Sequence, residues 1–126
     1  MDIFRIYHLH CARRLSALPD SHPCSQLHGH SFRVEVHLSG PLDAVLGWVV
    51  DFAEIDAAWQ TVHAALDHRY LNDIPGLANP TSEGLAVWLW NTLKPPLPGL
   101  AKIMVMESHD SGCIYRGEPQ DYQASR

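Results

Sequence analysis

Apolar and polar residues alternate strictly from residue 31 to residue 38, and this run constrains the fold more than any other feature of the chain. The apolar members are Phe32, Val34, Val36 and Leu38, and the polar members are Ser31, Arg33, Glu35 and His37. Successive side chains of a strand point to opposite faces, so the alternation predicts a strand from His28 onward with one buried face. His28 and His30 are in phase with the apolar members and are expected on that face.

Other strands are indicated by short runs rich in apolar or aromatic residues and bounded by Pro, Gly, Asp or Ser. They are residues 4–9, residues 48–50 as a short buried strand, residues 102–107 as a strand buried on both faces, and residues 113–115 as a short edge strand. Residues 17–26 and 72–80 are expected to form loops.

Two helices are predicted between these strands. Asp51 is expected to cap the first helix, whose apolar residues recur at three- and four-residue spacing. The second helix is expected to begin at Thr81-Ser82-Glu83 and to end at Lys94-Pro95-Pro96, because proline cannot continue a helix. The apolar face of the first helix consists of Ile55, Ala58, Trp59, Val62, Ala65 and Leu66.

This order of elements predicts the fold class. Strands followed by two helices and further strands indicate an α+β domain, with a four-stranded antiparallel sheet and both helices on one face. The open edges of such a sheet favour closure into a barrel by oligomerisation. The length of 126 residues suits one domain, which we place at residues 1–118, followed by a C-terminal tail of residues 119–126.

Charge and hydropathy exclude several classes of function. A net charge of −5 argues against direct binding of a nucleic-acid backbone. The longest apolar-rich run, residues 45–53, is too short to span a membrane, and residues 1–5 do not begin a secretory leader. We therefore expect a cytoplasmic protein with no membrane partner. In that compartment Cys11, Cys24 and Cys113 are expected to stay reduced.

His28 and His30 form a candidate site for a divalent metal. Residues two apart on a strand have Cα atoms about 7 Å apart and side chains on one face, so both imidazoles can reach one ion. Gly29 between them allows another group to approach closely. Cys24, four residues before His28, is a candidate ligand or reactive thiolate, and the alternative is a small buried apolar residue.

Two further positions carry groups that suit acid–base or binding chemistry. Asp67-His68 follows the first helix and can orient and activate a thiol or hydroxyl, although such a pair also occurs as an ordinary helix end. Glu107 ends an apolar strand, where an unpaired carboxylate is costly, so it is expected to hold a cation or a ligand rich in N–H groups.

Five ordered segments together resemble the 6-pyruvoyl-tetrahydropterin synthase superfamily, and most closely its bacterial 6-carboxy-tetrahydropterin synthase branch. The resemblance spans residues 4–118 and includes Cys24 in a Cys-x-x-x-His-Gly-His spacing. The segments are residues 24–32, 47–52, 66–73 and 79–83, and Glu107 with residues 112–115.

The resemblance implies a tunnelling fold, assembled as a homohexamer of two trimers with active sites between subunits. It implies that 7,8-dihydroneopterin triphosphate becomes 6-carboxy-5,6,7,8-tetrahydropterin, with loss of acetaldehyde and triphosphate, in queuosine biosynthesis. The alternatives are the 6-pyruvoyl-forming reaction on the same substrate and a non-catalytic metal- or pterin-binding paralogue.

The resemblance also implies roles for individual residues. His28 and His30 would bind Zn²⁺, and Cys24 would move protons with help from Asp67 and His68. The pterin ring would be held by Glu107, Thr81 and Ser82.

One position departs from the family pattern. The family carries its third zinc histidine at the end of the first strand, where the ungapped match here is Arg13, which cannot ligate zinc. His10 can take this role after a shift of three residues, Cys11 can replace it, or two ligands alone remain. We predict His10 as the third ligand, and Arg13 as a fixed positive charge toward the triphosphate if two ligands remain.

Overall fold

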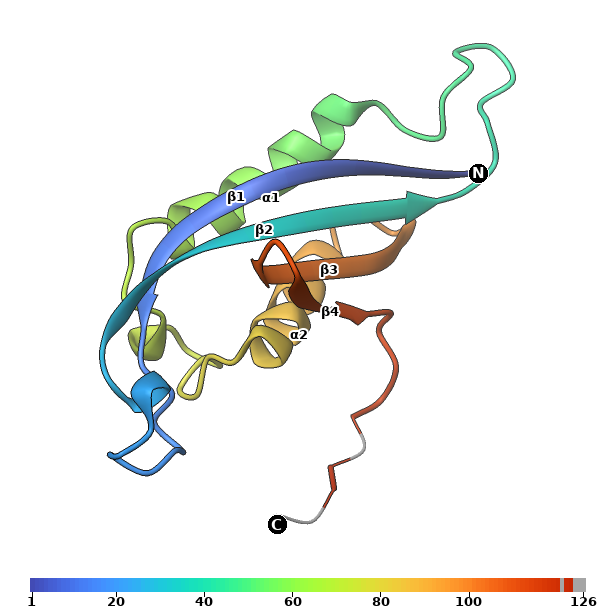
Figure 1. Cartoon of the computed structure of the whole chain (residues 1–126). Coiled ribbons are helices and arrows are strands. Elements are labelled where there is room, and N and C mark those ends of the chain that lie inside the picture. The colour runs from blue at the N-terminus through green and yellow to red at the C-terminus, as the bar shows by residue number, and fades with distance from the viewer. Residues whose placement is uncertain (121, 124–126) are drawn as a thin grey trace.

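The computed structural model, which describes residues 1–120, 122 and 123, is a single twisted sheet with two helices packed against one face (Figure 1). This confirms the α+β prediction. The strands are β1 (Asp2–Arg13), β2 (His28–Ser39), β3 (Leu100–Ser108) and β4 (Ser111–Tyr115). The helices are α1 (Phe52–Leu66) and α2 (Ser82–Leu93), and the 3₁₀ turns are η1 (Pro23–Ser25) and η2 (Leu71–Asp73).

The four strands are antiparallel in the order β1-β2-β3-β4. β1 pairs with β2 without interruption from Asp2↔Ser39 to Arg13↔His28. The first strand is therefore longer than the predicted residues 4–9, because β2 offers a partner along its whole length. This pairing brings the end of β1 beside the two histidines of β2.

The core lies between the sheet and the helices. Ile55, Trp59, Val62 and Leu66 of α1 are buried, as the predicted helical face requires. α1 contacts β1, α2 contacts β3 and β4, and the two helices contact each other. The sheet contributes Leu9, Cys11, Phe32, Val34, Val36, Leu38, Leu100, Ile103 and Val105 to this core.

Capping residues set where both helices begin. The Asp51 carboxylate accepts a hydrogen bond from the amide of Ala53 at 2.9 Å, which confirms the predicted first cap. The Thr81 hydroxyl accepts one from the amide of Gly84 at 3.0 Å. α2 ends at Leu93, before Lys94-Pro95-Pro96.

Two strand predictions were wrong in detail. β3 is buried on one face only, because Met104 and Met106, which alternate with the buried residues, are partly exposed. Residues 48–50 form bends instead of a strand, and Trp48 is 41% exposed. The reason is local: the amide of Asp43 donates to the carbonyl of Trp48, and Gly47 with a φ of 77° closes this loop.

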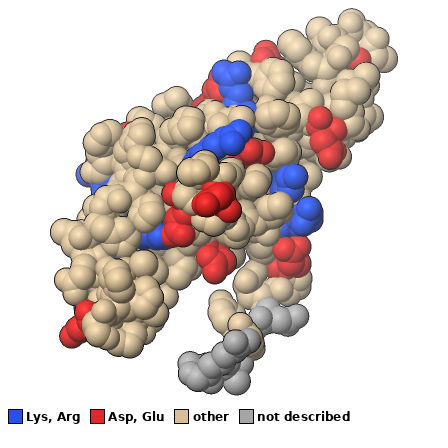
Figure 2. Space-filling view, in the orientation of Figure 1, with Lys and Arg blue, Asp and Glu red and all other residues tan. Residues whose placement is uncertain are grey.

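Among the described residues, no helix is long and apolar enough to cross a membrane. On the face seen in Figure 2, Lys and Arg side chains are interspersed with Asp and Glu side chains. The predicted tail of residues 119–126 lies partly outside the described residues, at 121 and 124–126.

Candidate active site

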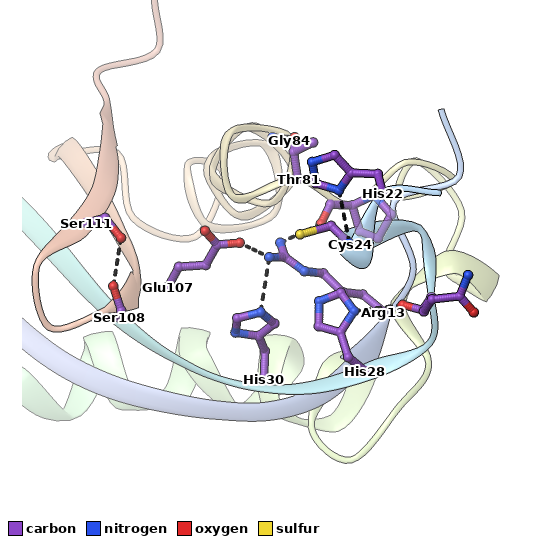
Figure 3. Close-up of polar contacts among 12 residues, drawn as sticks. Arg13, His22, Cys24, His28, His30, Thr81, Gly84, Glu107, Ser108 and Ser111 are labelled. Carbon is purple, nitrogen blue, oxygen red and sulfur yellow. Dashed lines mark hydrogen bonds and ion pairs between the residues drawn. The ribbon is translucent and has the colours of Figure 1, made fainter. Parts of the chain in front are cut away.

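Side chains from three strands meet on the helix-facing side of the sheet. Arg13, His28 and His30 share this face because Arg13 is the register partner of His28, and His30 is two residues further along β2. Glu107, near the end of β3, and Cys24 in η1 point toward the same place (Figure 3). Residues that are distant in sequence therefore surround one guanidinium group.

Local hydrogen bonds hold Cys24 at this place. Its amide donates to Nδ1 of His22 at 3.0 Å, and its carbonyl accepts from the amide of Leu15 at 2.8 Å. Pro23 starts the 3₁₀ turn, where its missing N–H leaves no donor unpaired. The half-buried thiol thus belongs to an ordered turn, and all three cysteines are free thiols.

The hydrogen bonds of the two imidazoles define which nitrogen carries a proton. Nδ1 of His28 lies 2.8 Å from the carbonyl oxygen of Gln26, so it is the donor and Nε2 is left as an acceptor. Nε2 of His30 lies 3.3 Å from Nη2 of Arg13, so it accepts from the guanidinium. Burial, the charge of Arg13 and then that of His28 lower the pKa of His30, which favours its neutral form.

Arg13 is 1% exposed and is held from several sides. Nη1 donates to the carbonyl oxygen of Pro80 at 3.0 Å, and Nη2 forms an ion pair with the Glu107 carboxylate. The guanidinium carbon lies 5.0 Å from the centre of the Phe32 ring, on which His30 also stacks at 5.2 Å. Burial lowers the pKa of Arg13, and electrostatic interactions with Cys24, Cys11 and Glu83 oppose this, while a guanidinium stays protonated in proteins.

Two buried polar atoms of the described residues have no hydrogen-bond partner, and they are Nε of Arg13 and Oγ of Ser82. The first belongs to the cluster itself, and Ser82 is the first residue of α2, two residues after Pro80, whose carbonyl accepts from Arg13. Buried polar groups without partners are rare in proteins and often mark a site where a ligand completes the bonding. The predicted contact Thr81 differs, because its hydroxyl already caps α2.

Asp67 and His68 form a hydrogen-bonded pair, with His68 Nδ1 and Asp67 Oδ2 2.7 Å apart. The other Asp67 oxygen accepts from the amide of His10, and the amide of His68 donates to the carbonyl of His10 at 2.6 Å. These bonds fix His68 at a φ of 56°, an unusual backbone conformation for a residue other than glycine. They also satisfy the hydrogen-bonding capacity of the His10 amide and carbonyl, which lie on the edge of β1 that no described strand pairs with.

The dyad of Asp67 and His68 does not lie beside Cys24. Its contacts attach it to His10 on the edge of β1, and the His68 side chain is 78% exposed there. A hollow of about 510 Å³ adjoins it, lined by His10, Cys11, Ala12, Gly29, His30, Ser31, His68, Arg69 and Tyr70. Within one chain, the structure brings together Cys24, His28, His30 and Glu107. The dyad shares the lining of the hollow with His30, but its hydrogen bonds and ion pairs go to His10 and His63 and not to Cys24.

The structure also does not bring His10 to the two histidines of β2. His10 pairs with Ser31, and its Nδ1 lies 2.8 Å from the Ser31 hydroxyl. Neighbouring residues of a strand face opposite ways, so His10 lies on the face opposite to His28 and His30. Cys11 does face His30, but burial and then the Asp67 charge raise the pKa of its thiol to about 11.

The donor groups do not fit the expected three-ligand zinc site. Within residues 1–120, 122 and 123, no group of three or more His, Cys, Asp or Glu side chains is arranged to hold a metal ion. Arg13 stands where a third donor would meet the two histidines, and it engages Nε2 of His30. A zinc ion needs that lone pair and is repelled by the guanidinium charge.

Sequence reasoning did not identify Phe32 or the carbonyl of Pro80 as parts of this site. A signal for the cluster was present, because Arg13 is in phase with Leu9 and Cys11 on β1. An arginine in the buried phase of a strand needs partners on that face. The carbonyl of Pro80 is invisible to such reasoning, since it depends on where α2 begins.

Comparisons with known proteins relate this chain to pterin enzymes. The family model of 6-pyruvoyl tetrahydropterin synthase matches residues 2–118. A 6-carboxy-5,6,7,8-tetrahydropterin synthase from Synechocystis is 39% identical over 98 residues, which cover 73% of this chain and 76% of that protein. A dihydroneopterin monophosphate aldolase from Pyrococcus furiosus is 36% identical over 90 residues, covering 69% of this chain and 75% of the relative.

Solved structures include a similar fold. The 6-pyruvoyl tetrahydropterin synthase of Caenorhabditis elegans superposes with a TM-score of 0.86 and 26% sequence identity. The match covers 94% of this chain and 96% of the nematode chain. The fold is therefore shared with an enzyme of this name over almost the whole length of both chains.

Proposed function

The chain belongs to the 6-pyruvoyl tetrahydropterin synthase family, and from this premise we propose that it is a 6-carboxy-5,6,7,8-tetrahydropterin synthase. It would convert 7,8-dihydroneopterin triphosphate and one water molecule to 6-carboxy-5,6,7,8-tetrahydropterin, acetaldehyde and triphosphate. The observation that carries the proposal is the convergence of Cys24, His30 and Glu107 around Arg13, next to two unpartnered buried polar atoms. Similarity to the Synechocystis synthase supports the choice of product.

Glu107 is proposed to hold the pterin ring. A carboxylate has about four acceptor positions, and Arg13 engages one oxygen of Glu107, whose side chain is 36% exposed. The remaining positions can accept N–H groups from the aminopyrimidine edge of the ring. The hydroxyl of Ser82, which has no hydrogen-bond partner, is proposed as a further contact of the ring. Thr81 is expected to contribute less to ring binding, because its hydroxyl already caps α2.

Cys24 is proposed to move protons on the three-carbon side chain of the substrate. A thiolate can remove the proton of a C–H bond next to a side-chain oxygen, and an ordered turn holds this thiol among polar groups. The paired Asp67 and His68 can take up or return a proton, because Asp67 orients the imidazole through Nδ1. Since the dyad lies away from Cys24 of its own chain, we infer that it serves Cys24 of a second copy.

An oligomer is therefore part of the proposal, with the homohexamer of two trimers as the expected form. Exposed apolar side chains in the loop before α1 and at its first residue support such association, because isolated chains rarely expose apolar groups in clusters. These are Leu42, Val45, Leu46, Trp48 and Phe52. A purified protein that stays monomeric in light-scattering measurements contradicts the shared site.

From the family resemblance we further propose that the protein acts in queuosine biosynthesis in the cytoplasm, with no direct contact to nucleic acid or membrane. Zn²⁺ is expected from the resemblance, but the donor groups around Arg13 do not fit it, and no step above depends on a metal.

Product analysis tests the proposed reaction. Purified protein is incubated with 7,8-dihydroneopterin triphosphate, and the pterin products and acetaldehyde are identified by mass spectrometry. We expect the 6-carboxy pterin and acetaldehyde, and a loss of about 10²- to 10⁴-fold in Cys24→Ala, the range for removing a proton-transfer group. If the product is instead that of a 6-pyruvoyl synthase or an aldolase, the protein has the activity of one of those relatives and not the proposed one. If wild type and Cys24→Ala are equally inactive, the protein is a non-catalytic paralogue.

Mixing variants tests the shared site. Cys24→Ala and His68→Ala each lose one half of the proposed proton path. If the halves come from different copies, unfolding and refolding the two variants together restores sites in which both halves are intact. Recovery of turnover supports this arrangement, and a mixture no more active than the separate variants rejects it. Mixing Cys24→Ala with itself is the control.

A further inference from the structure

The groups around the Arg13 guanidinium resemble those that surround a bound metal ion. Its guanidinium engages a carboxylate, an imidazole lone pair and a main-chain carbonyl, from Glu107, His30 and Pro80 respectively. Such neutral and anionic donors are the groups that coordinate metal ions in proteins. The guanidinium also lies over the Phe32 ring, which attracts positive charge.

The two histidines are arranged around this charge. The Nδ1–H group of His28 donates to the Gln26 carbonyl, the kind of outer contact that directs Nε2 toward a cation. Nε2 of His30 is directed at Nη2 of Arg13. The ring centres are 4.9 Å apart, so both imidazoles border the same small volume (Figure 3).

We propose that the Arg13 guanidinium is the resident cation of this site and takes the position of a divalent ion beside His28, His30 and Glu107. The chain then binds its anionic ligand without a metal. Coulomb repulsion from the guanidinium and the occupied lone pair of His30 both disfavour a second cation in the same volume.

The free donor of Arg13 indicates what this cation does. Nε has no partner although it is buried, and a guanidinium presents its donors in a planar fork that matches oxygen anions. This step rests on the proposed function. We assign Nε of Arg13 as the hydrogen-bond donor to the substrate oxygen that becomes negative when Cys24 removes a proton from the substrate side chain. The charge is fixed before the reaction, so it needs no ion from solution.

Zinc binding tests the proposal without any turnover assay. Zinc content after dialysis is measured by mass spectrometry, and zinc affinity by calorimetry, for wild type, Arg13→His and Arg14→His. We expect less than a tenth of an equivalent in wild type and one equivalent in Arg13→His, which adds a third imidazole on the face of His28 and His30. Arg14→His introduces the same residue at the next, exposed position and is expected to behave as wild type.

Two results overturn the proposal. One is a wild-type protein that retains a full equivalent of zinc that His28→Ala removes. The other is Arg13→His that folds, by circular dichroism, and gains no zinc. If Arg13→His does not fold, Arg13→Cys provides a smaller third ligand and is judged by the same criterion.

Turnover after treatment with a zinc chelator tests whether the reaction depends on a metal. We expect that wild-type turnover is unchanged after prolonged treatment with a strong zinc chelator, and that zinc does not stimulate it. Loss of turnover that only zinc restores contradicts the inference and leaves the proposed reaction intact. Absence of turnover under every condition instead contradicts the proposed reaction, while the zinc-binding result still decides the role of Arg13.

Discussion

β1 carries two arginines on the same face, and their surroundings are opposite. Arg5, near the start, has a side chain that is 47% exposed, and it pairs with both oxygens of Asp56 at 3.0 and 3.2 Å. Arg13, at the end, is 1% exposed and keeps Nε without a partner. Both clusters contain a carboxylate and an aromatic ring, so the difference lies in burial and in unused bonding capacity.

The Asp56 cluster has the form of a structural contact. Asp56 of α1 accepts from Arg5 and, at 2.6 Å, from the hydroxyl of Tyr7, whose ring stacks on Trp59 at 4.4 Å. It ties α1 to β1, and Asp56 receives bonds at both carboxylate oxygens. The cluster at Arg13 is instead incomplete, with Ser82 nearby also lacking a partner. A charge kept buried and only partly bonded indicates a role in binding or catalysis.

The largest expected effect separates the two arginines. Arg13→Met should lower turnover by about 10²- to 10³-fold, as for loss of one preorganised donor. The free energy of unfolding should fall by no more than about 3 kcal/mol, because Glu107 loses its partner but its side chain is 36% exposed and can be solvated. Arg5→Met should keep wild-type turnover. Steady-state kinetics and urea unfolding measure both, and equal loss of turnover in the two variants removes the distinction.

Phe32→Leu is expected to have the next largest effect. The ring is fully buried beneath Arg13 and beside His30, so its loss removes the cation–π contact and leaves a void. We expect a loss of about 1 to 3 kcal/mol in the free energy of unfolding, together with a decrease in turnover smaller than that of Arg13→Met. Unchanged turnover in a stably folded variant shows that Phe32 does not position the guanidinium.

Asp56→Asn should cost about 1 kcal/mol at neutral pH, the range of a partly exposed ion pair with an added hydrogen bond. The Tyr7 hydroxyl, followed by Arg5, lowers the pKa of Asp56 against the effect of burial. A carboxyl with a lowered native pKa stabilises the fold above its unfolded value of about 3.9, and loses this as pH falls through the native value. The difference from wild type should therefore shrink in acid, and a constant difference from neutral to acid pH argues against this origin.

Tyr7→Phe is expected to have the smallest effect, about 0.5 to 1 kcal/mol for one hydrogen bond. Burial and then Asp56 raise the pKa of Tyr7 above its ordinary value, so the phenol remains a donor through the neutral range. The ring can still stack on Trp59. Thermal unfolding should show this small loss with wild-type turnover, and a large loss of turnover links the structural cluster to catalysis.

Local patterns in the sequence predicted most of the fold. The alternation before Leu38 predicted β2, and the spacing from Ile55 to Leu66 predicted α1, because both depend on neighbouring residues. Residues 48–50 were mispredicted because their apolar side chains belong to a loop closed by Asp43 and Gly47. Composition alone does not distinguish a short buried strand from such a loop.

The site was predictable only where residues lie on one predicted strand. His28 and His30 share a face because of their spacing, but the residues of β1 that lie beside them depend on the register between β1 and β2. That register places Arg13 opposite His28, and no local pattern specifies it. Alternation along β1 then puts His10 on the other face from Arg13. The separation of the Asp67–His68 pair from Cys24 likewise depends on how residue 68 attaches to the edge of β1.

Chemical rescue of Arg13→Ala tests the central claim most directly. Turnover of this variant, freed of metal with a chelator, is measured with millimolar guanidinium, with ethylammonium as a second cation, or with zinc. We predict that guanidinium restores turnover more than the other two, and that Arg5→Ala, which is active without additions, does not respond. Restoration by zinc alone, or no restoration by guanidinium in a folded variant, contradicts the assignment of Arg13 as the cation of this site.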